Sequence, residues 1–106
     1  MNNIYCYFIQ EGINGNIKIG VTKSIKSRLR TLQTANSEKL RLLGYIFGNK
    51  EKESELHRLF IEYRVQGEFF TVNKKLIDYI NDNNLIQDNY IEIQENKLMI
   101  YKRMKK

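Results

Sequence analysis

Residues 4–21 read IYCYFIQEGINGNIKIGV, a pattern typical of a β-hairpin. Residues 4–10 are rich in aromatic and β-branched side chains, and residues 17–21 resume that pattern after a segment with two glycines. Gly20, near the end of the second run, would let that strand approach a ligand or the next helix closely. The sequence therefore predicts two antiparallel strands joined by a Gly/Asn turn.

A helix is predicted directly after this hairpin. Ser24 is suited to cap its first turn, and Ile25, Leu29 and Leu32 recur at helical spacing as far as Ala35. The cations on or beside its exposed face are Lys23, Lys26, Arg28 and Arg30.

The middle of the chain predicts one more strand, a second helix and a short strand or extended segment. Residues 40–47 are apolar enough for a buried strand, and residues 48–49 end it. Residues 51–64 predict an amphipathic helix, and residues 68–72 predict a short strand or extended segment after it. The apolar residues expected to face inward from this helix are Leu56, Leu59, Phe60 and Tyr63.

The C-terminal third predicts a helix and a second hairpin. Asn73 can cap a helix in which Leu76, Ile77 and Ile80 face the core. Residues 90–93 and 98–101, joined through residues 95–96, are expected to pair as strands. Residues 97–106 contain five cations and no acid, which predicts a solvated basic tail or edge strand.

Composition limits the classes of function. With 106 residues, 42% of them hydrophobic, the chain suffices for one domain and excludes a multi-domain enzyme. Eighteen Lys and Arg against twelve Asp and Glu give a net charge of +6, which favours a polyanionic partner. One cysteine cannot form an internal disulfide, and no apolar run approaches a membrane span or a secretion signal. We therefore expect a soluble intracellular protein, in the cytoplasm or nucleus of its host or source cell, without membrane contact.

The residue types needed for metal-assisted phosphodiester cleavage are all present. Such a site needs an oxygen ligand for Mg²⁺ or Mn²⁺, a group that orients water, and a fixed cation for the phosphate. Glu53 is the favoured carboxylate and Glu55 the competitor, and Glu53 shares a helix face with His57. Arg28 can bind phosphate bidentately, whereas Lys18 would act as a mobile point charge.

Each of these residues also has a purely structural interpretation. Tyr7 alone is more often a sheet residue, and a glutamate such as Glu53 in a charged helix is usually solvated. A lone His57 beside a core position is more often structural, and Arg28 can simply keep its helix soluble. Only the ordered set favours a site.

That ordered set resembles the GIY-YIG nuclease superfamily, in its viral and fungal branch labelled a meiotically upregulated or phage-type DNA-binding domain. The resemblance covers Tyr5 to about Val72. It rests on YCYFIQ (5–10), IKIGV (17–21), RL (28–29), LQT (32–34), LHRLF (56–60) and RVQGEFF (64–70).

The resemblance implies an α+β fold, a small three-stranded antiparallel sheet flanked by helices. Residues 1–72 would form the nuclease domain, and residues 73–106 a C-terminal helix, hairpin and basic tail packed on the same single domain. It also implies one divalent metal, Mg²⁺ or Mn²⁺, held by a helical glutamate, Glu53 or with a shifted register Glu55.

Further roles follow residue by residue from the same resemblance. The first-motif tyrosine, which helps to activate water, falls on Tyr7 rather than Tyr5, and Arg28 engages the scissile phosphate. Lys18 replaces the second-motif tyrosine, and a cation cannot act as the proton acceptor unless its pKa is lowered. His57 would contact phosphate or water. Arg64 and Glu68 match a branch signature, first interpreted as an ion pair or loop brace.

Two functions are predicted as alternatives. The first is a divalent-metal-dependent endonuclease that hydrolyses phosphodiester bonds in DNA. The second is a catalytically inactive nucleic-acid-binding module of the same fold, with DNA or single-stranded nucleic acid as partner. Lys23, Lys26, Arg30 and Arg64 are the expected nucleic-acid-binding residues. The terminal hairpin and basic tail could also form a homodimer beside either function.

Overall fold

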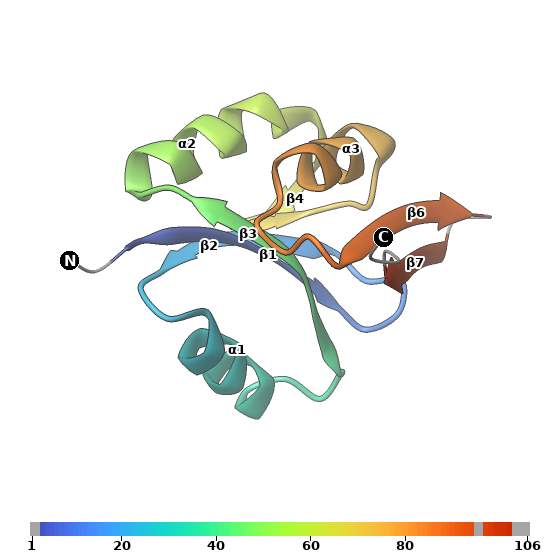
Figure 1. Cartoon of the computed structure of the whole chain (residues 1–106), viewed down its shortest axis with the longest axis horizontal. Coiled ribbons are helices and arrows are strands. Elements are labelled where there is room, and N and C mark those ends of the chain that lie inside the picture. Colours follow the sequence, from blue (N-terminus) through green and yellow to red (C-terminus); the bar gives the residue numbers. More distant parts are fainter. Residues whose placement is uncertain (1–2, 95–96, 103–106) are drawn as a thin grey trace.

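The computed structural model describes residues 3–94 and 97–102, which form one sheet, three α-helices and a separate hairpin (Figure 1). The elements, in chain order, are β1 (Tyr5–Glu11), β2 (Ile17–Thr22), α1 (Ile25–Thr34), β3 (Leu40–Phe47), α2 (Lys50–Leu59), a 3₁₀ helix (Ile61–Tyr63), β4 (Arg64–Gln66), β5 (Phe69–Phe70), α3 (Lys74–Asn83), β6 (Asn89–Gln94) and β7 (Lys97–Lys102).

The sheet has five strands in the order β3-β1-β2-β5-β4, and each recorded strand pair is antiparallel. The α+β class is confirmed, but the prediction of three strands is wrong. The predicted second helix stops at Leu59, and the chain then turns through the 3₁₀ helix into β4. Gly67, with a φ of +55°, turns the chain from β4 into β5, and Phe69 and Phe70 pair with β2. Strand β5 lies within residues 68–72, for which the sequence predicts a short strand or extended segment, whereas β4, with three residues, carries too little periodicity for a sequence pattern to reveal it.

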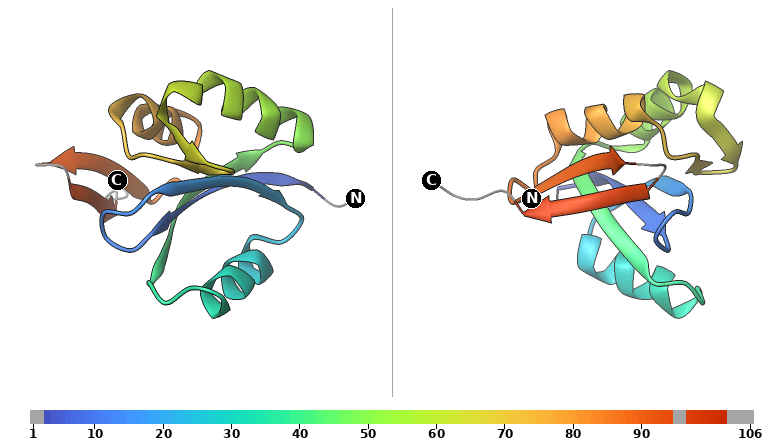
Figure 2. Two further views of the ribbon diagram at one scale, coloured as in Figure 1. Left: turned by 180° about the vertical axis from the view of Figure 1, so that it is seen from behind. Right: turned by 90° about the vertical axis from the view of Figure 1, so that its right-hand side faces the viewer.

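Helices cover both faces of the sheet. Helix α1 lies on one face, and α2 and α3 lie on the other, as two further views show (Figure 2). Side-chain caps fix where these helices begin. Ser24 accepts a hydrogen bond from the Ser27 amide at 3.3 Å, and Asn73 accepts one from the Leu76 amide at 2.8 Å. Asn49 caps α2 in the same way, which places the start of α2 directly after β3.

Alternation along β1 and β2 divides the apolar residues between two cores. Cys6, Phe8 and Ile19 face α2 and α3 and belong to the larger core. Tyr7 and Ile9 face α1 and form a smaller core with Leu40, Leu29 and other partly buried residues. Leu56 and Phe60 of the second predicted helix are buried as expected, whereas Leu59 is 45% exposed.

The hairpin β6–β7 is a second sheet that lies at the end of the molecule away from the N-terminus (Figure 1). Ile91 and Leu98 from this hairpin are buried in the same core as Leu76 and Ile77 of α3. The Asn81 side chain bonds both backbone groups of Ile91, at 2.6 and 3.0 Å, and so stands in for a strand partner. The basic tail expected after this hairpin falls partly on residues 103–106, outside the described residues.

Candidate functional site

Tyr7 and Gly20 are opposite each other in the pairing of β1 with β2. A Cβ added at Gly20 would come within 2.5 Å of Tyr7 Cζ and nearer still to the Tyr7 hydroxyl. Only glycine leaves room there, so the tyrosine ring extends across β2 toward the edge of the sheet. Tyr7 is 2% exposed.

The edge of β2 loses its strand partner just before Gly20. Strand β5 pairs with Ile17 and Lys18, and the Ile19 amide still donates to the Glu68 carbonyl at 2.9 Å. The Ile19 carbonyl is instead 3.0 Å from His57 Nε2, on α2. Because a carbonyl only accepts, His57 Nε2 carries the proton and Nδ1 is left as the acceptor of the neutral ring. The contact places the His57 face of α2 at this open edge.

Glu53 and Glu55 have opposite environments on α2. Glu53 is 7% exposed, and its Oε2 has no hydrogen-bond partner within the described part of the chain. Its Oε1 is 3.8 Å from Nζ of Lys50, whose side chain is 82% exposed. Glu55 is on the solvent side, where its carboxylate is 3.5 Å from Lys52 Nζ. A buried carboxylate oxygen without a partner is costly, and bound metal or water would satisfy it.

Arg28 approaches the same region from the opposite face of the sheet. A hollow of about 470 Å³ lies between the starts of α1 and α2 and is lined by Ile4, Val21, Thr22, Lys23, Ser24, Arg28 and Lys50. Arg28 is exposed, and no acid pairs with its guanidinium among residues 3–94 and 97–102. The hollow therefore has three cationic side chains and open space for an anion.

The pKa of Tyr7 indicates which charged side chains influence its hydroxyl group. Burial raises the pKa of the Tyr7 phenol to about 12, with further upward contributions from Glu68 and Glu53 and an opposing one from Arg28. Glu53 from α2 and Arg28 from α1 thus act on one hydroxyl group. The phenol remains protonated at neutral pH, and so it can donate a hydrogen bond but does not act as a base.

Lys18 is placed beside this group rather than within it. Its Nζ is 3.8 Å from Glu68 Oε2 and 5.5 Å from the centre of the Phe69 ring. Arg64 and Glu68 were expected to form an ion pair or a loop brace; Glu68 pairs with Lys18 instead, and Arg64 Nε donates to the Gly67 carbonyl at 2.8 Å. Arg64 therefore braces the β4–β5 turn, which positions Glu68 against Lys18.

The described residues contain no group of three or more His, Cys, Asp and Glu side chains that could together hold a metal ion. A Mg²⁺ ion nevertheless requires few protein ligands, because it usually keeps several waters and binds one or two carboxylates together with substrate phosphates. The Oε2 of Glu53, which has no partner among the described residues, fits that requirement as a single protein ligand.

The T5orf172 domain family matches residues 4–84, which span the five-stranded sheet, all three α-helices and every site residue described in this subsection. The chain belongs to the T5orf172 domain family. Comparison with curated proteins and with solved structures gives no match.

Membership in the T5orf172 family corrects the resemblance stated above. T5orf172 is a family distinct from the GIY-YIG nucleases, and no GIY-YIG match is found, so that assignment is wrong. The roles that the resemblance gave to individual residues therefore have no support from it. T5orf172 domains are nuclease-like and DNA-binding, which agrees with the coarser prediction of a nucleic-acid partner.

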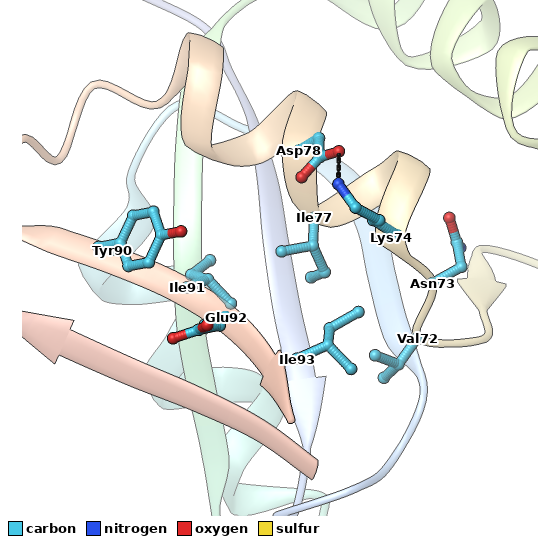
Figure 3. A pocket seen from close by; sticks show the side chains of 9 residues that line it. All are labelled: Val72, Asn73, Lys74, Ile77, Asp78, Tyr90, Ile91, Glu92 and Ile93. Atoms are coloured by element: carbon cyan, nitrogen blue, oxygen red, sulfur yellow. Dashed lines mark hydrogen bonds and ion pairs between the residues drawn. The ribbon is translucent and has the colours of Figure 1, made fainter. Parts of the chain in front are cut away.

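A second hollow is lined by none of the predicted site residues. It measures about 500 Å³ and lies between α3 and β6, with Ile77, Ile91 and Ile93 directed into it (Figure 3). Lys74 and Asp78 pair at its rim, at 2.6 Å. Among residues 3–94 and 97–102, no helix is long and apolar enough to cross a membrane.

Sequence reasoning missed Lys50 and the electrostatic part played by Glu68. Lys50 lies three residues before Glu53, a spacing that places both on one helix face and could have identified it. Glu68 was expected to brace a loop, and its influence on Tyr7 depends on the β5 register, which the sequence does not reveal. The predicted DNA-binding residues Lys23, Lys26 and Arg30 are all exposed around α1.

Proposed function

We propose that this T5orf172 domain is a divalent-metal-dependent endonuclease that hydrolyses phosphodiester bonds in DNA at the open edge of β2. The observation that carries the proposal is the buried Glu53 carboxylate, whose Oε2 lacks a partner within the described residues. Arg28, which has no acidic partner among the described residues, influences the pKa of the same Tyr7 hydroxyl as Glu53 does. A carboxylate and an arginine in this state suit a site that binds a metal and a phosphate together.

Each side chain has a separate task in the proposed reaction. Glu53 would hold Mg²⁺ or Mn²⁺, which supplies a Lewis acid and lowers the pKa of bound water. Arg28 binds the non-bridging oxygens of the phosphate and stabilises the charge that grows there during attack. Tyr7 keeps its proton and donates a hydrogen bond that orients water or phosphate. Water adds to phosphorus and releases one proton to the surrounding solvent, the P–O bond to one deoxyribose breaks, and that oxygen takes up a proton from solvent.

The cations around α1 extend the proposed phosphate contact. Lys23, Lys26 and Arg30 are exposed, and no acid pairs with them among residues 3–94 and 97–102. Contacts of this kind neutralise backbone phosphates regardless of sequence. We therefore expect weak sequence selectivity.

The test is cleavage of end-labelled single- and double-stranded DNA and RNA in Mg²⁺, Mn²⁺ or EDTA. Glu53→Gln and Arg28→Ala should each lower the cleavage rate at least a hundredfold. Glu55→Gln is the matched control for Glu53→Gln, because it makes the same change of charge on the same helix at an exposed position, and it should retain the rate within about threefold.

A binding module without turnover is the second candidate, and one observation favours it. Burial raises the pKa of Tyr7 to about 12, so its phenol is not poised to accept a proton at neutral pH, and Lys18 Nζ lies 3.8 Å from Glu68 Oε2. Folded wild-type protein that retards DNA but does not cleave it in either metal would support this second function and reject the endonuclease.

A further inference from the structure

An aromatic cluster lies on the α1 face of the sheet, next to the proposed phosphate site. Tyr5 is opposite Phe47 in the pairing of β1 with β3, and Tyr7 is opposite Tyr45. Side chains two residues apart on a strand share a face, so these residues lie on the face that Tyr7 shares with α1. We call Tyr5, Tyr45 and Phe47 the aromatic cluster.

The cluster holds Phe47 in a fixed orientation while leaving it open to solvent. The Phe47 and Tyr5 rings stack, with centroids 5.4 Å apart and planes at 29°. The Tyr45 ring meets Tyr5 edge-on, at 5.3 Å and 82°. Phe47 is nevertheless 57% exposed, and it lies on β3, an edge strand of the sheet. An ordered aromatic ring this exposed offers a face to a planar partner.

The cluster adjoins the cations of the proposed phosphate site. Tyr5 is opposite Thr22 in the pairing of β1 with β2, and Thr22 lines the hollow that also contains Arg28, Lys23 and Lys50. One row across the three neighbouring strands therefore contains Phe47, Tyr5 and Thr22. Strand spacings place the backbone of Phe47 roughly 10 Å from that of Thr22. An aromatic surface bordered by cations is complementary to a nucleotide, which has a planar base and an anionic phosphate.

We propose that Phe47 is a stacking platform for an unpaired base of a DNA strand whose phosphate is bound at Arg28. This inference rests on the proposed phosphate site and adds the substrate class, namely DNA that is single-stranded or locally unpaired beside the scissile bond. Bases inside a duplex are already stacked and present only their edges, so they cannot use the ring face. Phe47 therefore favours single strands and frayed or branched junctions over continuous duplex.

The test measures binding of a short oligothymidylate and of a duplex of equal length, both in EDTA so that no cleavage occurs. Phe47→Ala and Phe47→Leu should weaken single-strand binding roughly 5- to 150-fold. Phe47→Tyr should bind like wild type, and duplex binding should change less than twofold in all three variants. Ile61→Ala is the matched control, since Ile61 is also 57% exposed but carries no ring and lies in the 3₁₀ helix.

A direct readout of stacking comes from Phe47→Trp, because a base stacked on indole quenches its fluorescence. The chain has no tryptophan of its own, so the introduced indole is the only one that reports. Saturating oligothymidylate should quench the Phe47→Trp variant strongly and should leave the Ile61→Trp control unchanged.

Three results would overturn the stacking platform. They are equal losses of single-strand and duplex affinity, no quenching in the Phe47→Trp variant, and self-association that depends on Phe47 without an effect on DNA binding. The last result would assign the cluster to an interface between two copies.

The two proposals can fail separately. Single-strand binding that depends on Phe47, in a protein that cleaves nothing, supports the platform and rejects the endonuclease. Metal-dependent cleavage that Phe47→Leu leaves unchanged on both single-stranded and duplex DNA rejects the platform and retains the endonuclease.

Discussion

The Tyr7 phenol fills the space above Gly20 that any side chain at position 20 would occupy, because a Cβ there would come within 2.5 Å of Tyr7 Cζ. The pair couples the shape of the sheet to the position of the hydroxyl group. The pKa of that hydroxyl is influenced by Glu53, Glu68 and Arg28. Its placement therefore determines whether the groups from α1 and α2 face a common ligand.

Gly20→Ala should therefore destabilise the protein and abolish any cleavage. The new methyl group forces the buried Tyr7 ring out of its position, at a cost of about 1–3 kcal/mol in the free energy of unfolding. Urea unfolding monitored by circular dichroism measures this cost. In a Tyr7→Leu background no ring lies over position 20, and the cost of Gly20→Ala should fall by more than half. An equal cost in both backgrounds would mean that the two residues are not coupled.

Divalent metal should stabilise the protein through Glu53. A ligand that binds only the folded state at a hundred times its Kd adds about 2.7 kcal/mol, which corresponds to several degrees of melting temperature for a domain of this size. Wild type and Glu55→Gln should show this rise in saturating Mn²⁺, and Glu53→Gln should not.

The same variant separates a metal ligand from a structural carboxylate. In EDTA, Glu53→Gln should melt no lower than wild type. The substitution exchanges a buried carboxylate, whose Oε2 has no partner among the described residues, for a neutral amide. A large loss of stability in EDTA would instead mean that the Glu53 carboxylate supports the fold through contacts of its own.

The protein should lose stability as the pH rises from about 9 to about 12. Burial raises the pKa of the Cys6 thiol from 9.0 to about 11 and that of the Tyr7 phenol from 10.0 to about 12, with Glu53 adding to both shifts. The folded state holds these protons more tightly than the unfolded chain, so unfolding releases them. This contribution to stability is fully present below pH 9 and is lost as the pH rises through the folded-state pKa values of about 11 and about 12. The free energy of unfolding then falls by on the order of 2–3 kcal/mol for each group.

Urea unfolding between about pH 8 and about pH 11.5 checks this sign and window. Tyr7→Phe should remove the part of the slope above about pH 10, whereas the exposed Tyr101→Phe should leave the slope unchanged. A stability that stays flat from about pH 8 to the onset of Lys deprotonation would contradict the burial of both groups.

Elements with many periodic residues could be predicted, and those with few could not. The first hairpin, the strand at residues 40–47 and the caps at Ser24 and Asn73 follow from local patterns, and the structure confirms them. Helix α2 ends at Leu59 although the helical pattern continues to Tyr63, and Leu59 is on the surface. The role of Asn81 in pairing the Ile91 backbone depends on where two distant elements meet, which no local pattern encodes.

The site shows the same division between local and distant information. Helical spacing predicted that Glu53 and His57 share a face, and it could not choose between Glu53 and Glu55. Burial against the sheet distinguishes them, because Glu53 is 7% exposed while the side chain of Glu55 is 62% exposed. The convergence of Arg28 and Glu53 from opposite faces depends on β5 ending before Gly20, which is a property of the register.

The cations of α1 should determine how DNA affinity depends on salt. A side chain that contacts one backbone phosphate releases about one counterion, so Lys26→Ala and Arg30→Ala should each lower the slope of log affinity against log salt by about 1. The loss should be similar for unrelated DNA sequences, since phosphate contacts carry no sequence information.

Lys74→Ala is the matched control, because Lys74 is equally basic, its side chain is 84% exposed, and it pairs with Asp78 on the opposite face of the sheet. Fluorescence anisotropy over a range of salt concentrations measures the slopes. If Lys74→Ala lowered the slope as much as Lys26→Ala, the DNA would lie on the α3 side of the molecule, and the phosphate track along α1 would be wrong.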